Sequence, residues 1–256
     1  LQLVEERDDL YLELIALYNL SGNFDLALQL LKKRKFHPWE GGEGKVIGQF
    51  RISLISKAIG CLAANDPQCA IQLLEESLSP PDTIGEAKLP LAQDQDVFYL
   101  LGCAWAMLGQ TKQSRLYFKK ASEGELEVGE AFFYNDTQAD KVLYQGLAWA
   151  RLGQKSKAEK LFRSLLSYGT ENLDKKTRFD YFAVSFPHLS NWNIDSDKRN
   201  RVHCLFLQGL GLLGLGKTEE ARDCLQAALL KDPAHHSAKL HYDLITNYQI
   251  INILSI

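Results

Sequence analysis

The sequence has few of the residues that build covalent or metal-based chemistry. Its five cysteines (Cys61, Cys69, Cys103, Cys204 and Cys224) form no CxxC pair, and their odd number excludes a fully paired disulfide framework. Most of them occupy apolar positions of predicted helices. We therefore expect small core residues in a reducing compartment, which favours the cytoplasm.

A concentrated positive charge is also missing. The 29 basic and 32 acidic residues are interleaved, the formal net charge is -3, and no block of Lys and Arg occurs. This balance argues against a nucleic-acid-binding protein. We find no signal peptide and no uninterrupted apolar run of about 18 residues, so we expect no membrane among the partners. Because the chain opens at Leu1 in mid-helix style, we expect a fragment of a larger protein.

The sequence does contain a pattern of small and large residues that occurs three times. Counted from a glycine at position 0, each copy has a bulky residue at 3, a glycine at 7, a small residue at 12 and a bulky residue at 16. Small residues let two antiparallel helices approach closely, and a glycine at position 7 ends the first helix in the left-handed conformation. The copies are Gly102-Trp105-Gly109-Ser114-Phe118, Gly146-Trp149-Gly153-Ala158-Phe162 and Gly209-Leu212-Gly216-Ala221-Leu225, with a looser copy Ile15-Tyr18-Gly22-Ala27-Leu31.

This spacing resembles the tetratricopeptide repeat, a helix–turn–helix unit of about 34 residues. One such hairpin buries too little apolar surface to offset its conformational entropy, so hairpins must stack. We predict an all-α tetratricopeptide-like solenoid of helical hairpins forming a single array over residues 1–256. The predicted hairpins cover about 4–35, 46–79, 94–122, 138–168 and 198–231, with a terminal helix from about 233.

Two segments extend this plan. The second and third reference glycines are 63 residues apart, which leaves room for one further helix, and residues 174–189 are the candidate. The final residues, 249–256, are apolar, and the sequence does not decide what this tail does.

Three motifs resemble cofactor-binding or metal-binding sequences, but their surroundings in the sequence do not fit such a site. Gly209–Gly214 matches GxGxxG as a string, but the glycines lie inside a predicted helix rather than after a strand. Gly41–Val46 lacks the first glycine and the Ser or Thr of a phosphate loop. His235, His236 and His241 do not share one helix face as metal ligands would. We therefore expect no cofactor and no metal.

In tetratricopeptide arrays a concave groove is lined mostly by the first helix of each hairpin. The corresponding positions here are apolar, unlike the Lys and Asn of a clamp for acidic peptide termini. This favours a groove filled by another domain or an added helix. The predicted groove residues are Tyr99, Cys103, Leu143, Leu147, Phe206 and Leu210.

A closer resemblance rests on three strings: KFHPWEGGEGKV at 35–46, DYFAVSFPHL at 180–189, and HCLFLQGLGLLGLGKTEEA at 203–221 followed by AHHSAKLH. These are similar to the C-terminal helical-repeat region of large bacterial tetratricopeptide proteins. The N-terminal half of those proteins is a domain of unknown function, thought to be a β-sandwich related to carbohydrate-active folds. The resemblance implies an intracellular multidomain protein of which this chain is the scaffolding end.

The glycine-rich loop at residues 37–45 carries the only concentrated set of chemically capable groups. One interpretation is that Trp39 fills a gap between repeats while the glycines allow sharp bends. The other is that His37, Glu40 and Glu43, beside Lys45, project toward a missing N-terminal domain and complete an interface or site there. The sequence leaves both open.

We therefore expect a non-catalytic scaffold that binds protein, most simply another domain of the same polypeptide. The alternative function is the accessory half of a carbohydrate-processing enzyme that contributes loop 37–45 to its site. The sequence names no partner, small-molecule ligand or oligomeric state.

Overall fold

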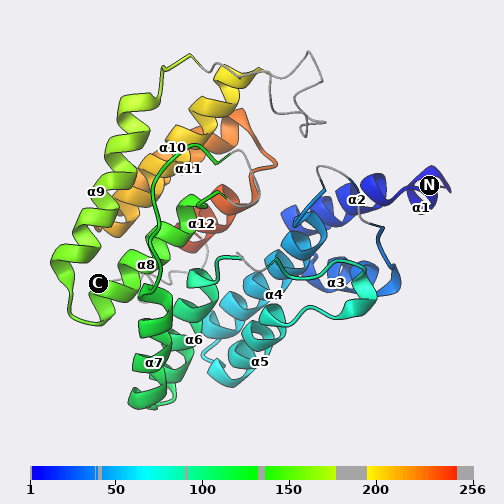
Figure 1. Ribbon diagram of the computed structural model, residues 1–256, viewed down its shortest axis with the longest axis horizontal. Coiled ribbons are helices and arrows are strands. Elements are labelled where there is room, and N and C mark those ends of the chain that lie inside the picture. The colour runs from blue at the N-terminus through cyan, green and yellow to red at the C-terminus, as the bar shows by residue number, and fades with distance from the viewer. Residues whose placement is uncertain are drawn as a thin grey trace.

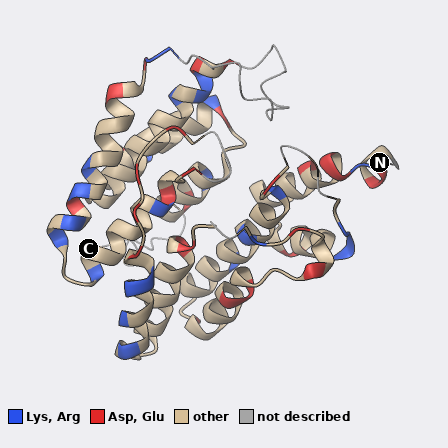
Figure 2. Ribbon diagram, viewed as in Figure 1, with Lys and Arg blue, Asp and Glu red and all other residues tan. Residues whose placement is uncertain are grey.

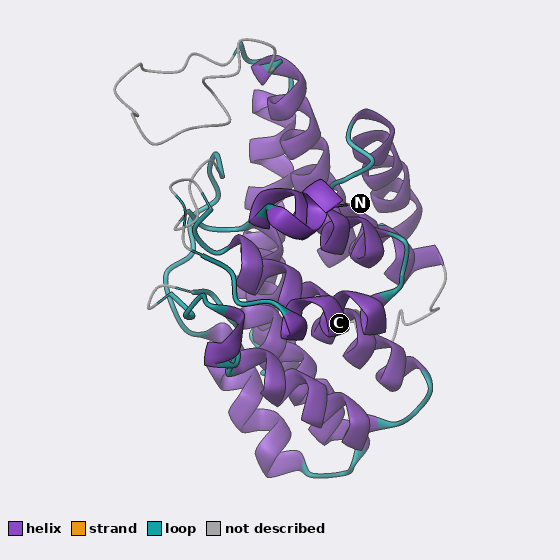
Figure 3. Cartoon of the chain, turned by 90° about the vertical axis from the view of Figure 1, so that its right-hand side faces the viewer, coloured by secondary structure: helices purple, strands orange, loops and turns teal. Residues whose placement is uncertain are grey.

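The computed structural model describes residues 2–37, 39, 42–89, 92–131, 136–176 and 195–246. All regular structure within these ranges is helical (Figures 1 and 3), so the predicted all-α class is confirmed. The helices are α1 (Gln2–Glu6), α2 (Asp8–Leu20), α3 (Phe24–Lys33), α4 (Lys45–Ala63), α5 (Pro67–Leu78), the 3-10 helix η1 (Asp82–Ile84), α6 (Gln95–Met107), α7 (Thr111–Ser122), α8 (Ala139–Arg151), α9 (Lys155–Asn172), α10 (Ser196–Gly214), α11 (Thr218–Lys231) and α12 (His236–Thr246).

From α2 to α11 these helices form five consecutive pairs, each joined by a short turn (Figure 1). The last helix begins at His236 instead of the expected 233, because Pro233 lies in the turn before it and His235 Nδ1 accepts the Ala238 amide at 3.1 Å. Most of the helix expected at 174–189, and the whole 249–256 tail, lie outside the described residues.

Every pair turns at a residue with positive φ. Gly22, Gly109, Gly153 and Gly216 have φ between 70° and 83°, which confirms the left-handed ends predicted for these glycines. The α4–α5 turn uses Asn65 instead, at φ 58°. Asparagine is one of the few side chains that visits this region routinely. Counting back from Asn65 places α4–α5 in the register of the other pairs: Ala58 at position 0, Ala70 at 12 and Leu74 at 16.

The glycines at position 0 face the bulky residues at position 16. A Cβ atom added to Gly102 would lie 2.5 Å from the Phe118 ring, and one added to Gly209 would lie 2.8 Å from Leu225. Real Cβ atoms essentially never make contacts this short. The two helices of each of these pairs therefore lie closer together than a residue with a side chain at position 0 would allow. The close approach predicted from the spacing is confirmed.

Phe162 belongs to two such contacts. A Cβ on Gly146 of α8 would lie 2.4 Å from its ring, and a Cβ on Gly214 of α10 would lie 2.2 Å from it. The ring is buried between the two glycines. One side chain of α9 therefore fixes the spacing to the helix before it and to the helix after it.

The buried apolar residues form two clusters that divide within α4. The N-terminal cluster runs from Tyr11 to Leu54 and includes Ile84, whereas the C-terminal cluster begins at Ile55 and ends at Leu244. Helix α4 supplies both. It is also the one described helix long and apolar enough to cross a membrane by composition, although 56% of its most apolar stretch is buried in the fold. The sequence search overlooked it because glycines, serines and two charges interrupt the run.

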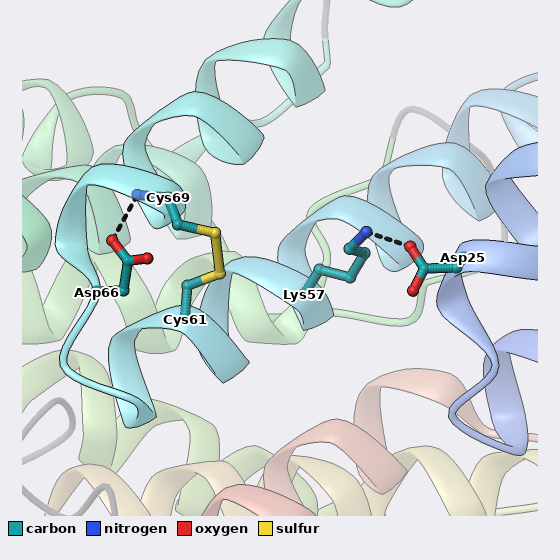
Figure 4. Close-up of a disulfide and its surroundings, with 5 residues drawn as sticks. All are labelled: Asp25, Lys57, Cys61, Asp66 and Cys69. Atoms are coloured by element: carbon teal, nitrogen blue, oxygen red, sulfur yellow. Dashed lines mark hydrogen bonds and ion pairs between the residues drawn. A yellow bond between two sulfur atoms is a disulfide. The ribbon is translucent and has the colours of Figure 1, made fainter.

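A disulfide joins the last turn of α4 to the first turn of α5 (Figure 4). Cys61 and Cys69 are half-buried, and their Cα atoms lie 6.0 Å apart, within the usual range for a disulfide. Asp66 starts α5 between them by accepting the Cys69 amide at 3.0 Å. The expectation that all five cysteines are unpaired core residues is therefore wrong for this pair; the free cysteines are Cys103, Cys204 and Cys224.

Candidate functional site

The predicted interaction loop divides into two parts. His37 is 86% exposed, and its ring Nδ1 lies 3.1 Å from Asp8 Oδ2, which also accepts the His37 amide. Trp39 packs against the N-terminal cluster, and its ring covers Gly42. The environment of Trp39 fits the packing interpretation of this loop. Glu40 lies outside the described residues, whereas Glu43 and Lys45 line a cleft.

The predicted groove residues do not line an open groove. Tyr99, Cys103, Leu143, Leu147, Phe206 and Leu210 are all 6% exposed or less. They face neighbouring helices of the chain itself: the Tyr99 and Tyr144 rings lie 5.6 Å apart, and the His241 ring of α12 lies 6.0 Å from the Phe206 ring. The groove prediction is corrected accordingly. These apolar side chains form the core between successive pairs, and α12 covers its last part.

The open concavity lies elsewhere. A cleft of about 640 Å³ is bounded by the end of α2, one face of α4, residues of 87–89 and 92–93, the start of α8 and α12. Both cores therefore contribute to its walls. Its charged lining residues are five acids, Glu43, Asp96, Asp136, Asp140 and Asp243, and four bases, Lys45, Arg51, Lys141 and Lys239.

An ion-pair network at the centre of the cleft joins three helices. Arg51 of α4 donates to Asp94 at 2.7 Å and lies 3.4 Å from Asp96 at the start of α6. Lys141 of α8 lies 2.5 Å from Asp96 and 3.3 Å from Asp140. Burial opposes the charge on Asp96, but Lys141 and Arg51 outweigh it and lower the pKa of its carboxyl. The network therefore fixes the positions of α4, α6 and α8 relative to one another where they border the cleft.

Tyr144 adds a polar group that the described protein leaves without a partner. The side chain lines the cleft, is 1% exposed, and its hydroxyl makes no hydrogen bond to any described residue. Burial, with the charges of Asp96 and Asp140, raises its pKa well above the usual value, so the hydroxyl stays protonated. A buried hydroxyl without a partner costs about 1–3 kcal/mol.

The histidines beside Tyr144 are neutral donors or acceptors. His241 Nδ1 lies 2.7 Å from the Ser237 carbonyl, so Nδ1 carries the proton and Nε2, which also has no partner among the described residues, is an acceptor. Burial lowers the pKa of His236, which lines the cleft, to about 4. The described ranges hold no group of three or more His, Cys, Asp or Glu side chains able to bind a metal ion.

Sequence reasoning missed Arg51, Asp96, Asp140, Lys141 and Tyr144. One signal was present: Asp96 and Asp140 each lie six residues before a reference glycine, at equivalent places in two repeats. A charge repeated at one position of a repeat marks a shared surface. With this geometry established, comparison with known proteins adds no identity: no protein-family model matches the chain, and no solved structure matches it significantly.

Proposed function

We propose that this chain is a tetratricopeptide-like array that works as a non-catalytic scaffold, and that its cleft binds a segment of polypeptide from another domain or protein. The proposal retains the expected setting, a large bacterial cytoplasmic protein, on the basis of the three free cysteines, although the Cys61–Cys69 disulfide argues against a reducing compartment. The observation that carries it is the cleft itself, which spans both cores and contains acids, bases and the unpartnered Tyr144 hydroxyl.

The composition of the cleft favours a polypeptide ligand. Acids and bases occur in nearly equal numbers along its walls, so a ligand of one charge sign gains little from it. A polypeptide carries side chains of both signs and main-chain groups that donate and accept. The rigid salt-bridge network at the centre lowers the entropic cost of binding because the walls are already ordered.

The alternative, an accessory half of a carbohydrate-processing enzyme, has less support. It needs loop 37–45 to project outward, but His37 is held by Asp8 and Trp39 packs on the core. Of the described residues of this loop, Glu43 and Lys45 line the cleft itself.

Two glycines of α4 provide a matched test. A Cβ on Gly48 meets nothing within 4 Å, and Gly48 lines the cleft. A Cβ on Gly60 also meets nothing within 4 Å, but Gly60 lies outside the cleft. Gly48→Phe therefore fills the cleft without disturbing the fold, and Gly60→Phe is its control on the same helix.

The measurement is a random peptide library displayed on phage and selected against the wild-type chain. We expect the selection to enrich peptides that bind Gly48→Phe at least about tenfold more weakly than the wild type, a loss of about 1.4 kcal/mol of binding free energy. The same peptides should bind Gly60→Phe with unchanged affinity. Failure to enrich any peptide, or equal binding by both variants, would contradict a peptide-binding cleft. Both variants are first compared with the wild type by circular dichroism.

A further inference from the structure

The outer face of α7 differs in charge from every other second helix of a pair. Lys112, Arg115, Leu116 and Lys119 are spaced as i, i+3, i+4 and i+7, so they share one side of the helix, and all four are exposed. Helix α7 contains no acidic residue, and Figure 2 shows its basic positions distributed along its length. These three basic side chains make no ion pair within the described part of the protein.

Exposed apolar side chains accompany this charge. Met107 and Leu108, at the turn between α6 and α7, are 41% and 38% exposed, and Leu116 is 47% exposed. Together with Lys112, Arg115 and Lys119 they make up a set of exposed basic and apolar side chains on the α6–α7 turn and on α7, here called the α7 face.

The other helix pairs show that the fold does not require this surface. At the place of Met107, α8–α9 has Arg151 and α10–α11 has Gly214. At the place of Leu116, the same two pairs have Lys160 and Asp223. The positions of Met107 and Leu116 therefore do not require an apolar side chain, whereas the position of Leu108 is leucine in all three pairs.

One basic side chain of this surface also works against the helix. Lys112 lies in the first turn of α7, where the helix dipole disfavours positive charge, and no acid of that turn compensates it. Helix α11, by contrast, begins with Glu219 and Glu220. Helix α9 shares the arrangement of α7, since it begins with Lys155 and Lys157 and has no acid in its first turn. The charge at position 112 is thus not explained by helix stability.

We propose that the α7 face docks on the surface of an anionic lipid bilayer. Lipid headgroups supply negative charge for the three basic side chains, and the interfacial region accepts the side chains of Met107 and Leu116. Nucleic acid accounts for the charge but not for the apolar side chains. The docking is peripheral, so it revises the expectation of no membrane partner, which considered only spanning segments. It is independent of the cleft.

The test uses sedimentation of the whole chain with vesicles of phosphatidylcholine alone or with phosphatidylserine at about 30%. We expect binding only to the anionic vesicles, weakening as salt is raised. The triple variant Lys112→Glu, Arg115→Glu, Lys119→Glu should bind at least about 100-fold more weakly, at about 1 kcal/mol for each basic side chain. Lys112→Glu supplies the acid that the first turn lacks, which helps the variant to fold.

Two further variants isolate the surface. Lys217→Glu, Arg222→Glu, Lys231→Glu makes the same charge change on the α11 side and should leave vesicle binding within about threefold of the wild type. Met107→Ser with Leu116→Ser keeps the charge and should weaken binding about tenfold or more. Absence of binding to anionic vesicles, equal binding to neutral ones, an equal loss in the α11 control, or binding to duplex DNA in place of vesicles would overturn the proposal.

Discussion

The first two helix pairs and the last three close the same interface with different residues. In the first two, position 0 is Ile15 or Ala58 and position 16 is a leucine; in the last three, position 0 is glycine and two of the three facing residues are phenylalanine. What all five share is a left-handed residue at position 7 and a buried small residue at position 12 (Ala27, Ala70, Ser114, Ala158 and Ala221). The turn and position 12 are thus common to all five pairs, whereas the residues at positions 0 and 16 differ between pairs.

A second contrast separates the two halves: the N-terminal and C-terminal cores are distinct clusters, and charged side chains of the cleft bridge them. The largest expected effect is therefore at this junction. Asp96→Leu removes the carboxylate that Arg51 and Lys141 share and leaves each of them one carboxylate, Asp94 or Asp140. It should lower the free energy of unfolding by about 3–5 kcal/mol, measured by urea denaturation.

The control for Asp96 is an exposed ion pair. Asp25 of α3 pairs with Lys57 of α4 at the surface (Figure 4), and its side chain is 88% exposed. Asp25→Leu should cost no more than about 1 kcal/mol. Similar costs for the two substitutions would show that the network does not join the halves.

The next effect concerns the glycines. Gly146→Ala places a methyl group against the Phe162 ring, which cannot move away because Gly214 contacts its other side. The substitution should therefore destabilise the protein by about 2–3 kcal/mol. Gly48→Ala in the open space of α4 should instead stabilise it by about 0.5–1 kcal/mol through helix propensity. Thermal and urea unfolding of both variants check the opposite signs. A neutral Gly146→Ala would mean that the spacing does not depend on the bare backbone at position 0.

The smallest expected effect is a pH dependence of the protein's stability that arises from histidines of the C-terminal half. Burial lowers the pKa of His203, His235, His236 and His241, whereas His37 in the N-terminal half is exposed. Each lowered pKa favours the neutral ring in the folded state. This stability is present above the unfolded value near 6.5 and is lost as the pH falls toward the folded value, about 4 for His236.

His236→Gln isolates one of these groups. The wild-type melting temperature should fall more than that of the variant when the pH drops from about 6.5 to about 4.5, by about 2–4 °C. Comparing the two proteins cancels the contribution of the carboxylates to the change in melting temperature, because they titrate in both. Identical slopes would mean that His236 is solvated in the folded state.

The parts of the fold that were predictable are those set by local sterics. Positive φ at Gly109 and the contact of Gly102 with Phe118 follow from residue size and spacing. The hairpin at 46–79 was predicted from its apolar face, but the glycine pattern did not assign its register because Asn65 takes the place of the turn glycine. The disulfide was missed for a related reason, since the turn and not a sequence motif brings Cys61 and Cys69 together.

The cleft was not predictable in the same way. Arg51 and Asp96 are 45 residues apart in sequence, and their pairing depends on how one hairpin stacks on the next. Tyr99 and Phe206 were predicted to line a groove filled by another domain or an added helix. Both are buried by neighbouring helices of the chain, and α12 contacts Phe206. Spacing specifies what happens inside a hairpin, and stacking geometry decides which side chains remain accessible.

The position of Phe162 limits how this protein can be shortened or lengthened. Because its ring lies between Gly146 and Gly214, a truncation that stops after α9 would expose an aromatic side chain to water, and a deletion of α8 would leave a void beneath it. Stable fragments should therefore end before α8 or extend through α10. The smallest exchangeable module in this region is three helices, not the two-helix hairpin that the repeat suggests.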